Sequence, residues 1–315
     1  MIKNKKVLIS GATGFIGANL VRRCVNDGAK VYIFTRPTSD KWRINDLTSS
    51  VNQYCVDLLD YEKLEKIILD IKPEIIFHTA VYGGYPFQRD ADRIIQTNIM
   101  GTINLVNACS KVGFDVFVNT GTSSEYGLKH NPMKESDLLE PRNDYGVSKA
   151  SATLFCQTKA RSEKLPIATL RLFSPYGYYE EAKRLVSSVI ISCLIEKSPK
   201  VSSSKSVRDF VFIEDVMDAY IKTAESKDKV AGQIFNIGFG KQHSVRKIVD
   251  EIIRVTGNNV KPELGKTPKR SNEPNVWQAD ISKAKKELGW QPKYNLDQGL
   301  ERTINWFKNN IGLYE

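Results

Sequence analysis

The sequence predicts an α/β fold, a doubly wound parallel sheet with helices on both faces. Short apolar runs rich in branched residues alternate with longer helical stretches through the first half of the chain. Strands that alternate with helices imply crossover connections and a parallel sheet. The first run, Lys6–Ser10, also leads directly into a glycine-rich turn and a further helix. This strand, turn and helix are typical of a nucleotide-binding sheet.

The remaining elements can be placed in chain order. After the first strand and a helix that continues to residue 26, we expect strands at 31–35, 51–55, Ile75–His78, 116–119 and Ile167–Leu172. The helices between them are predicted at 61–70, 91–112 and 145–162. Ligands of such sheets bind at the carboxyl ends of the strands. The polar residues of the sequence collect at those ends.

The alternation becomes irregular after residue 172. The predicted dinucleotide-binding domain spans residues 1–172, and residues 207–240 are expected to return to its sheet. Residues 173–206 and 241–315 would form a smaller substrate-binding lobe. No repeat or low-complexity linker separates the two parts, so we expect them to be interwoven.

Composition narrows the class of protein. A chain of 315 residues with 41% hydrophobic and 26% charged residues can bury a large core. Its net charge of +10 is dispersed, which favours a solvated basic surface over nucleic-acid binding. Five scattered cysteines and three separated histidines predict reduced thiols and no metal site. Without a membrane-spanning run or signal core, the expected location is the cytoplasm.

The glycine-rich turn has the spacing of a dinucleotide site. Gly11 permits the tight turn, Gly14 lets the backbone approach a pyrophosphate, and Gly17 allows the helix to pack on the strand. The phosphates would meet free N–H groups at the helix N-terminus. The predicted fold is therefore of the Rossmann type. The cofactor contacts expected in this segment are Gly11, Thr13, Gly14, Phe15, Ile16 and Gly17.

The second and third strands lead to residues suited to the adenosine half of a cofactor. An acidic residue after the second strand often binds the ribose of NAD, but this chain has Arg36. Arg36 could accommodate the 2′-phosphate of NADP or stack on the adenine of either cofactor. Asp57 and Leu58, after the third strand, are placed for the adenine. We expect NAD, with NADP left open by Arg36.

The fourth strand is followed by small residues that could flank the cofactor. Thr79, Ala80 and Val81 are expected to contact it, and Gly83 would let a substrate approach the backbone. Asn98, in the next helix, is either a cofactor contact or a buried structural amide.

Tyr145 and Lys149 share one face of a predicted helix, since residues four apart lie side by side. A tyrosine pKa of about 10 is too high for a base at neutral pH, and a nearby cation lowers it. Thr122, after the fifth strand, can return beside Tyr145 and share a proton with the same substrate oxygen. The alternative is a serine- and threonine-rich turn that caps a helix. Three neighbours of Thr122 are also predicted contacts. Thr120 is expected to contact the cofactor, and Ser123 and Ser124 are expected to contact the substrate.

Together, these segments resemble the extended short-chain dehydrogenase/reductase family, in the branch that acts on nucleotide sugars. The resemblance spans nearly the whole chain and includes three C-terminal landmarks: the segments 171–177, 207–215 and 277–292. It implies that Tyr145 is the catalytic acid/base and that Lys149 binds the nicotinamide ribose and lowers the tyrosine pKa. It implies further that Arg208 and Arg270 meet the diphosphate of a nucleotide-sugar substrate. A homodimer is expected from the resemblance only.

Two departures from the family pattern bear on the reaction. Sugar dehydratases carry acidic residues directly after the threonine, where this chain has Ser123 and Ser124, with Glu125 one position later. Ser174 stands where the family usually has the asparagine that contacts the sugar nucleotide. The first departure ranks the dehydratase third. Arg36 favours a reductase, but epimerases are frequent in this branch, so we expect a 4-epimerase of the UDP-hexose or UDP-N-acetylhexosamine type. The alternative hypothesis is an NADPH-dependent nucleotide 4-keto-6-deoxysugar reductase, and the third is a sugar dehydratase. The non-enzymatic hypothesis is a redox-sensing nucleotide binder.

Overall fold

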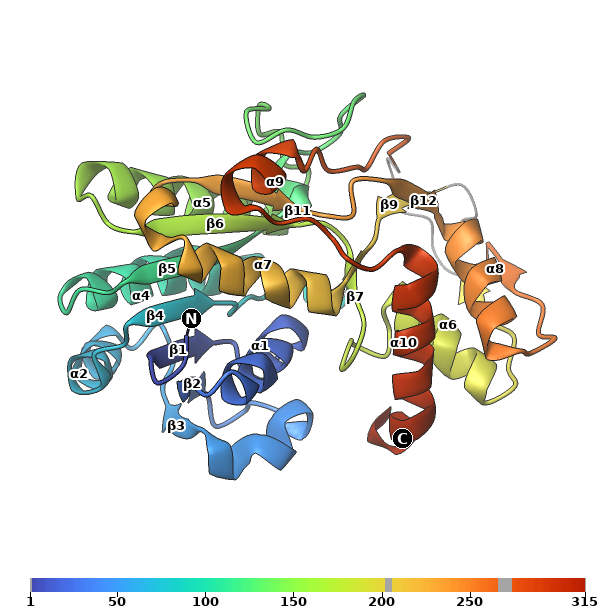
Figure 1. The fold of residues 1–315 in the computed structure, drawn as a ribbon, viewed down its shortest axis with the longest axis horizontal. Coiled ribbons are helices and arrows are strands. Elements are labelled where there is room, and N and C mark those ends of the chain that lie inside the picture. Colours follow the sequence, from blue (N-terminus) through green and yellow to red (C-terminus); the bar gives the residue numbers. More distant parts are fainter. Residues whose placement is uncertain (1, 202–205, 266–273, 315) are drawn as a thin grey trace.

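The computed structural model describes residues 2–201, 206–265 and 274–314. Its centre is a seven-stranded sheet in the order β3-β2-β1-β4-β5-β6-β11, with every neighbouring pair parallel (Figure 1). The predicted doubly wound parallel sheet is confirmed. Its strands are β1 (Lys6–Ser10), β2 (Lys30–Thr35), β3 (Asn52–Cys55), β4 (Ile75–His78), β5 (Val116–Thr122), β6 (Ile167–Leu172) and β11 (Ile234–Ile237).

Both faces of the sheet are buried, which explains why the central strands are apolar without alternation. In β1, Val7 and Ile9 belong to one core and Leu8 to the other. The first core includes α1 (Phe15–Asn26) and α7 (Ile213–Glu225), which pack against each other. The second core includes α2 (Tyr61–Ile71), α4 (Gly101–Ser110) and α5 (Asp144–Ser162). Edge strand β3 is mostly exposed.

The helix expected at 91–112 is interrupted. Its pieces are α3 (Ala91–Ile95), a π-helical turn η2 (Gln96–Met100) and α4. A π-helical turn is uncommon and is often found at a functional site. The interruption cannot be read from the residue pattern, because hydrophobic periodicity does not register one extra residue in a turn. Short 3-10 turns complete this half of the chain: η1 (Trp42–Ser50) and η3 (Ser123–Glu125).

A group of helices, called the second lobe below, lies beside the sheet. Helices α6 (Leu185–Leu194), α8 (Val245–Thr256) and α10 (Leu296–Asn310) pack on one another there (Figure 1). The other elements after β6 are β7 (Pro175–Tyr176), β8 (Lys200–Val201), β9 (Val207–Asp209), β10 (Val211–Phe212), η4 (Lys227–Lys229), β12 (Gln242–Ser244), β13 (Glu263–Leu264), α9 (Ser282–Leu288) and η5 (Ile311–Tyr314).

Of the strands within residues 207–240, only β11 joins the large sheet, while α7 packs on its face. Strand β9 pairs antiparallel with β12, and β10 pairs parallel with β7. The reason is the buried Asp209, whose carboxylate accepts backbone N–H groups from Phe239, Gly240 and Ala279. These bonds tie the end of β9 to the segment that follows β11 and to residue 279. The division into a cofactor domain and a substrate lobe stays a prediction.

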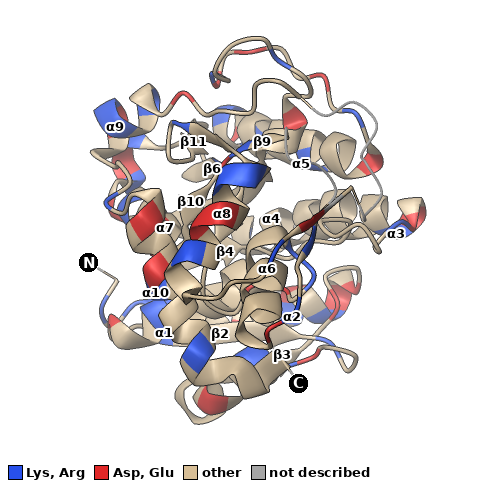
Figure 2. Ribbon diagram, turned by 90° about the vertical axis from the view of Figure 1, so that its right-hand side faces the viewer, with Lys and Arg blue, Asp and Glu red and all other residues tan. Residues whose placement is uncertain are grey.

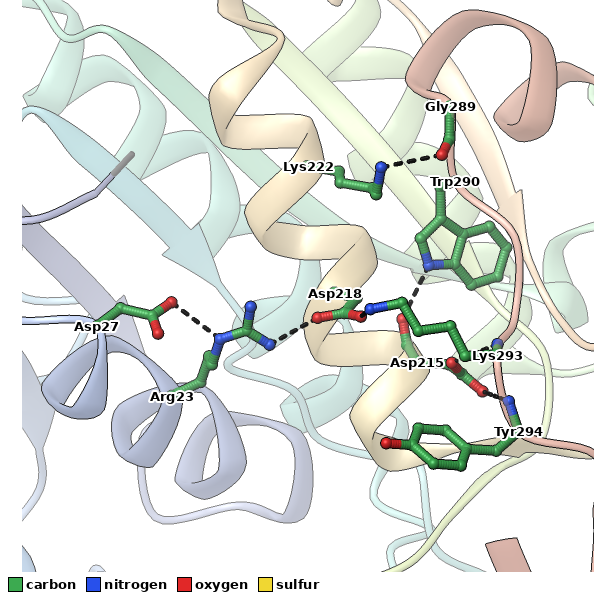
Figure 3. Close-up of polar contacts among 9 residues, drawn as sticks. All are labelled: Arg23, Asp27, Asp215, Asp218, Lys222, Gly289, Trp290, Lys293 and Tyr294. Carbon is green, nitrogen blue, oxygen red and sulfur yellow. Dashed lines mark hydrogen bonds and ion pairs between the residues drawn. The ribbon is translucent and has the colours of Figure 1, made fainter. Parts of the chain in front are cut away.

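A polar network joins the two parts of the chain (Figure 3). Asp218 on α7 accepts from Arg23 on α1 and from Lys293, which precedes α10. The Asp215 carboxylate accepts the backbone N–H groups of Lys293 and Tyr294.

Basic and acidic residues are mixed over the molecule in the side view (Figure 2). Along α8, for example, acidic and basic segments alternate.

Candidate active site

Two glycines of the turn, Gly11 and Gly17, have no room for a side chain. A Cβ on Gly11, where φ is +72°, would lie 2.5 Å from the backbone nitrogen of Ala80. A Cβ on Gly17 would lie 2.1 Å from the carbonyl oxygen of Gly11. Gly14 is the N-cap of α1, which starts at once with Phe15. The turn therefore leaves a cradle lined by backbone at the N-terminus of α1, which fits the pyrophosphate of a dinucleotide.

Tyr145 and Thr122 meet at the carboxyl end of the sheet. Thr122 ends β5, and Tyr145 lies in the first turn of α5, whose N-cap Asn143 accepts the N–H of Gly146. Burial raises the pKa of Tyr145, while a hydrogen bond with the Thr122 side chain lowers it. The Thr122 hydroxyl also accepts the N–H of Ser124 and caps η3. The cap expected of Thr122 is therefore present, and its sharing of a proton with the substrate stays a prediction.

Lys149 lies one turn after Tyr145 and is only 2% exposed. Burial lowers its pKa, and the negative charge of Glu125 offsets part of this effect. Glu125 is itself fully buried, accepts the N–H of Thr122 and pairs with Arg171 at 2.7 Å. Sequence reasoning noted Glu125 and Arg171 only as family landmarks and missed this pair. This ion pair could have been predicted from two residues of opposite charge that stand at the ends of neighbouring apolar strands.

Ser123 and Arg208 lie on either side of a tryptophan. The indole N–H of Trp277 donates to the Ser123 hydroxyl at 3.1 Å. The Arg208 guanidinium lies over the Trp277 ring at 5.4 Å from its centroid. Trp277 thus connects Ser123 and Arg208, two predicted substrate contacts. In the sequence, Trp277 was noted only as the start of a segment that resembles the family. Ser124 is half-buried beside Ser123, Ser174 follows β6, and Arg270 lies outside the described residues.

The adenosine-side residues also converge. Arg36, after β2, and Asp57, after β3, line one cavity of about 390 Å³. Arg93 on α3 lines the same cavity, and sequence reasoning missed it. Leu58 is buried against Gly101 of α4. The cavity contains two cationic side chains and one carboxylate at the expected edge of the sheet.

Three predicted cofactor contacts already have protein partners. Thr79 donates to the Ser10 carbonyl, and Thr120 shares a hydrogen bond with Tyr220 on α7. Asn98 pairs with both backbone groups of Tyr82. Of the other predicted contacts, Ala80 touches the glycine turn, Val81 is exposed, and Gly83 lies against the Tyr145 side chain.

A further cation acts on Tyr145 from the second lobe. Arg184, the N-cap of α6, lowers the pKa of Tyr145 through its positive charge. Its Nε lies 3.5 Å from the Glu180 carboxylate, which also accepts the Ser187 hydroxyl. Burial raises the pKa of Glu180 to about 7. Nothing in the sequence pattern linked Arg184 to Tyr145, because the two residues are 39 positions apart, counted as 184 − 145.

Replacing Arg184 by glutamine should move the pH profile of catalysis. Loss of the positive charge raises the pKa of Tyr145, so the limb along which activity rises with pH should shift to higher pH. The pH dependence of kcat/KM would show this shift. Arg184→Lys keeps the charge and should keep most of the wild-type profile. If the rising limb of the Arg184→Gln profile lay at the same pH as in the wild type, the charge of Arg184 would have no effect on Tyr145.

Within residues 2–201, 206–265 and 274–314, no group of three or more His, Cys, Asp or Glu could hold a metal ion. The same part of the chain contains no helix long and apolar enough to cross a membrane.

A backbone cradle for a dinucleotide and a tyrosine–lysine pair at the same end of the sheet define an enzyme that transfers protons and hydride with a nicotinamide cofactor. Residues 7–238 match the model of the "NAD dependent epimerase/dehydratase family". The chain belongs to this family, which confirms the resemblance seen in its motifs and the expected cofactor, NAD.

Individual relatives cover nearly the whole chain. A UDP-glucuronate 4-epimerase of Thermodesulfobacterium geofontis is 29% identical over 97% of each chain. A UDP-glucose 4-epimerase of Thermotoga maritima, solved with UDP-glucose, is 26% identical and superposes with a TM-score of 0.89, covering 97% of this chain and 99% of its own. A UDP-glucuronic acid 4-epimerase of Bacillus cereus, solved with its substrate and NAD, is 27% identical, with a TM-score of 0.86 and coverage of 96% and 99%.

Proposed function

We propose that this protein is a nucleotide-sugar 4-epimerase acting on a UDP-hexose or UDP-N-acetylhexosamine. The observation that carries the proposal is the proximity of Thr122 and Tyr145 at the carboxyl end of the sheet, the same end at which the glycine turn follows β1. The relatives named above are UDP-sugar 4-epimerases, which favours this reaction over the reductase. Serines at positions 123 and 124 support epimerisation over the dehydratase reading, since a dehydratase needs acidic groups there to remove water.

In this reaction Tyr145 holds and moves one proton. Its phenolate takes the proton of the C4 hydroxyl, and the Thr122 hydroxyl orients the same oxygen. Bound NAD supplies the acceptor and donor of hydride. After the resulting 4-keto sugar has turned, Tyr145 returns the proton to the oxygen. Lys149 would hold the nicotinamide ribose, and Arg208, stacked on Trp277, would meet the substrate diphosphate.

The cofactor content of the purified protein tests the reaction. We expect the denatured protein to release oxidised NAD, and the native protein to interconvert UDP-hexose epimers with no added cofactor. The assay should include UDP-glucose, UDP-N-acetylglucosamine and UDP-glucuronate. A protein free of cofactor that oxidises NADPH only in the presence of a 4-keto sugar would overturn the proposal in favour of the reductase.

We infer that the protein forms a homodimer through the α3–α5 face. Helices α3 and α5 pack together, and large apolar side chains on them and on the adjoining turn η2 are exposed: Ile95 on α3, Met100 in η2, and Val147 and Leu154 on α5. Exposed apolar side chains gathered on one face are typical of an interface. The mass of the protein in solution tests this inference, and a monomer at micromolar concentration would contradict it.

A cytoplasmic location is the companion inference. The five cysteines are all free, and four of them are buried, which suits a reducing compartment. Fractionation of cells that express the protein, with detection by antibody, would test it; recovery outside the cytoplasm would contradict it.

A further inference from the structure

A buried chain of hydrogen bonds begins below the glycine turn. Ser10, the last residue of β1, contacts His78, the last residue of β4, with 2.7 Å between Oγ and Nδ1. The other ring nitrogen, Nε2, lies 2.8 Å from the Thr102 hydroxyl on α4. All three side chains are at most 1% exposed. The next residue after Ser10 is Gly11, where the dinucleotide cradle starts.

The same chain continues to the catalytic helix. Thr102 donates to the carbonyl of Asn98 at 2.7 Å, within the π-helical turn η2. The Asn98 amide donates to the Ser148 hydroxyl at 2.9 Å, and Ser148 donates to the carbonyl of Tyr145 at 2.9 Å. Asn98 and Ser148 are also at most 1% exposed. Five consecutive contacts therefore lead from the glycine turn to the backbone of Tyr145.

The direction of every donor in this chain is determined. Thr102 has one hydroxyl proton and gives it to Asn98, so it must accept from His78. The imidazole consequently carries its proton on Nε2, and Nδ1 accepts from Ser10. Burial, together with the charge of Lys149, lowers the pKa of His78 to about 3, so the ring is neutral at pH 7. From Ser10 through His78 and Thr102 to the Asn98 carbonyl the hydrogen bonds run in one direction, and such bonds polarise and strengthen one another.

Asn98 also holds the loop on the other side of Tyr145. Its amide oxygen accepts the N–H of Tyr82, and its amide nitrogen donates to the Tyr82 carbonyl. The following residue, Gly83, lies against Tyr145, because a Cβ added to Gly83 would be only 3.5 Å from the Tyr145 Cβ. One buried amide thus ties both the helix and the loop that surround the catalytic tyrosine.

We propose that this chain of hydrogen bonds positions Tyr145 relative to the dinucleotide cradle, and that its members are positioning residues. They are Ser10, His78, Thr102, Asn98 and Ser148. The cradle and the catalytic helix are separate elements, and the chain is a direct polar connection between them. The turnover effects rest on the proposed epimerase function, whereas the protonation state of His78 does not.

Two threonines of the same geometry provide the main test. Thr102 and Thr223 are both fully buried and both donate to the carbonyl four residues earlier in their helix. Only Thr102 also accepts from a histidine. Thr102→Val should lower kcat about tenfold, the effect of about one hydrogen bond, with KM for the sugar nucleotide nearly unchanged. Thr223→Val should leave kcat at the wild-type value; equal losses in both variants would overturn the proposal.

A double-mutant cycle tests whether the chain acts as a unit. Thr102 and Ser148 belong to different helices and are connected through Asn98. If the chain is one positioning device, Thr102→Val combined with Ser148→Ala should lose about as much turnover as the more damaging single variant. Independent sites would multiply their losses, and that outcome would overturn the proposal. Unfolding temperatures of all variants separate lost positioning from lost folding.

Nitrogen-15 NMR of histidine-labelled protein gives a readout that needs no activity. His78, assigned with a His78→Asn variant, should show a protonated Nε2 and a bare Nδ1 across pH 5 to 8. In Thr102→Val that tautomer preference should weaken. A charged His78 ring, or the tautomer with the proton on Nδ1, in the wild type would contradict the proposed series of hydrogen bonds. If the protein epimerises no UDP-sugar, the proposed function fails, and this measurement still decides the inference.

Discussion

Tyr145→Phe should lower turnover by about 10²-fold or more, because it removes the hydroxyl that exchanges the proton with the substrate. The ring itself remains, so its packing against Gly83 and Gly84 is kept. KM should change little. The measurement is the steady-state rate of UDP-sugar interconversion, with the NAD content of the variant determined in parallel.

A remote tyrosine provides the control. Tyr176 is buried in the second lobe, where its hydroxyl reaches the Leu296 carbonyl. Tyr176→Phe removes a phenolic hydroxyl from the interior but leaves the residues of the candidate active site unchanged. The turnover of this variant should therefore stay near that of the wild type. Near-normal turnover in Tyr145→Phe would remove Tyr145 as acid/base and, with it, the proposed mechanism.

Glu125→Gln should reduce the free energy of unfolding by about 3–5 kcal/mol, the usual result of breaking a buried ion pair from one side. Glu125 and Arg171 have side-chain exposures of 0% and 2%. Glutamine has nearly the same shape but leaves the Arg171 charge uncompensated, and Arg171 Nη1 already has no hydrogen-bond partner among the described residues. Denaturant unfolding monitored by circular dichroism measures the change.

An exposed pair in the second lobe is the matched control. Arg246 and Asp250 lie one turn apart on α8, with side-chain exposures of 51% and 48%. Asp250→Asn removes a carboxylate in the same way and should cost at most about 1 kcal/mol, because solvent screens exposed pairs. A comparably small effect for Glu125→Gln would show that the buried pair contributes little. Loss of Glu125 also removes a charge that raises the pKa of both Lys149 and Tyr145, so the limb along which activity rises with pH should move to lower pH.

Local patterns predicted much of the fold. The apolar strand runs, the glycine turn and the start of the catalytic helix each depend on a few neighbouring residues, and the structure contains them at nearly the predicted positions. The small ladders of β9 and β10 were not predictable, since these strands pair with partners distant in the chain. The π-helical turn η2 was not predictable because one extra residue in a turn leaves no mark in the hydrophobic pattern. The carboxylate of Asp209 redirects its segment through contacts with residues 239, 240 and 279.

The candidate site shows the same division. Tyr145, Lys149 and Thr122 follow from spacing and from their place at a strand end or helix start. Arg184 and Trp277 could not be assigned from the sequence, because their relation to the site exists only when the second lobe packs on the sheet.

By itself, the sequence determined that this chain builds a parallel sheet with a dinucleotide cradle and a tyrosine–lysine pair, because those features are encoded within short segments. Only the tertiary structure decided what surrounds Tyr145. The buried Glu125–Arg171 pair, the charge of Arg184 and the hydrogen bonds from Ser10 to Ser148 join residues far apart in the chain. Their effects depend on distance and burial, which no local pattern specifies.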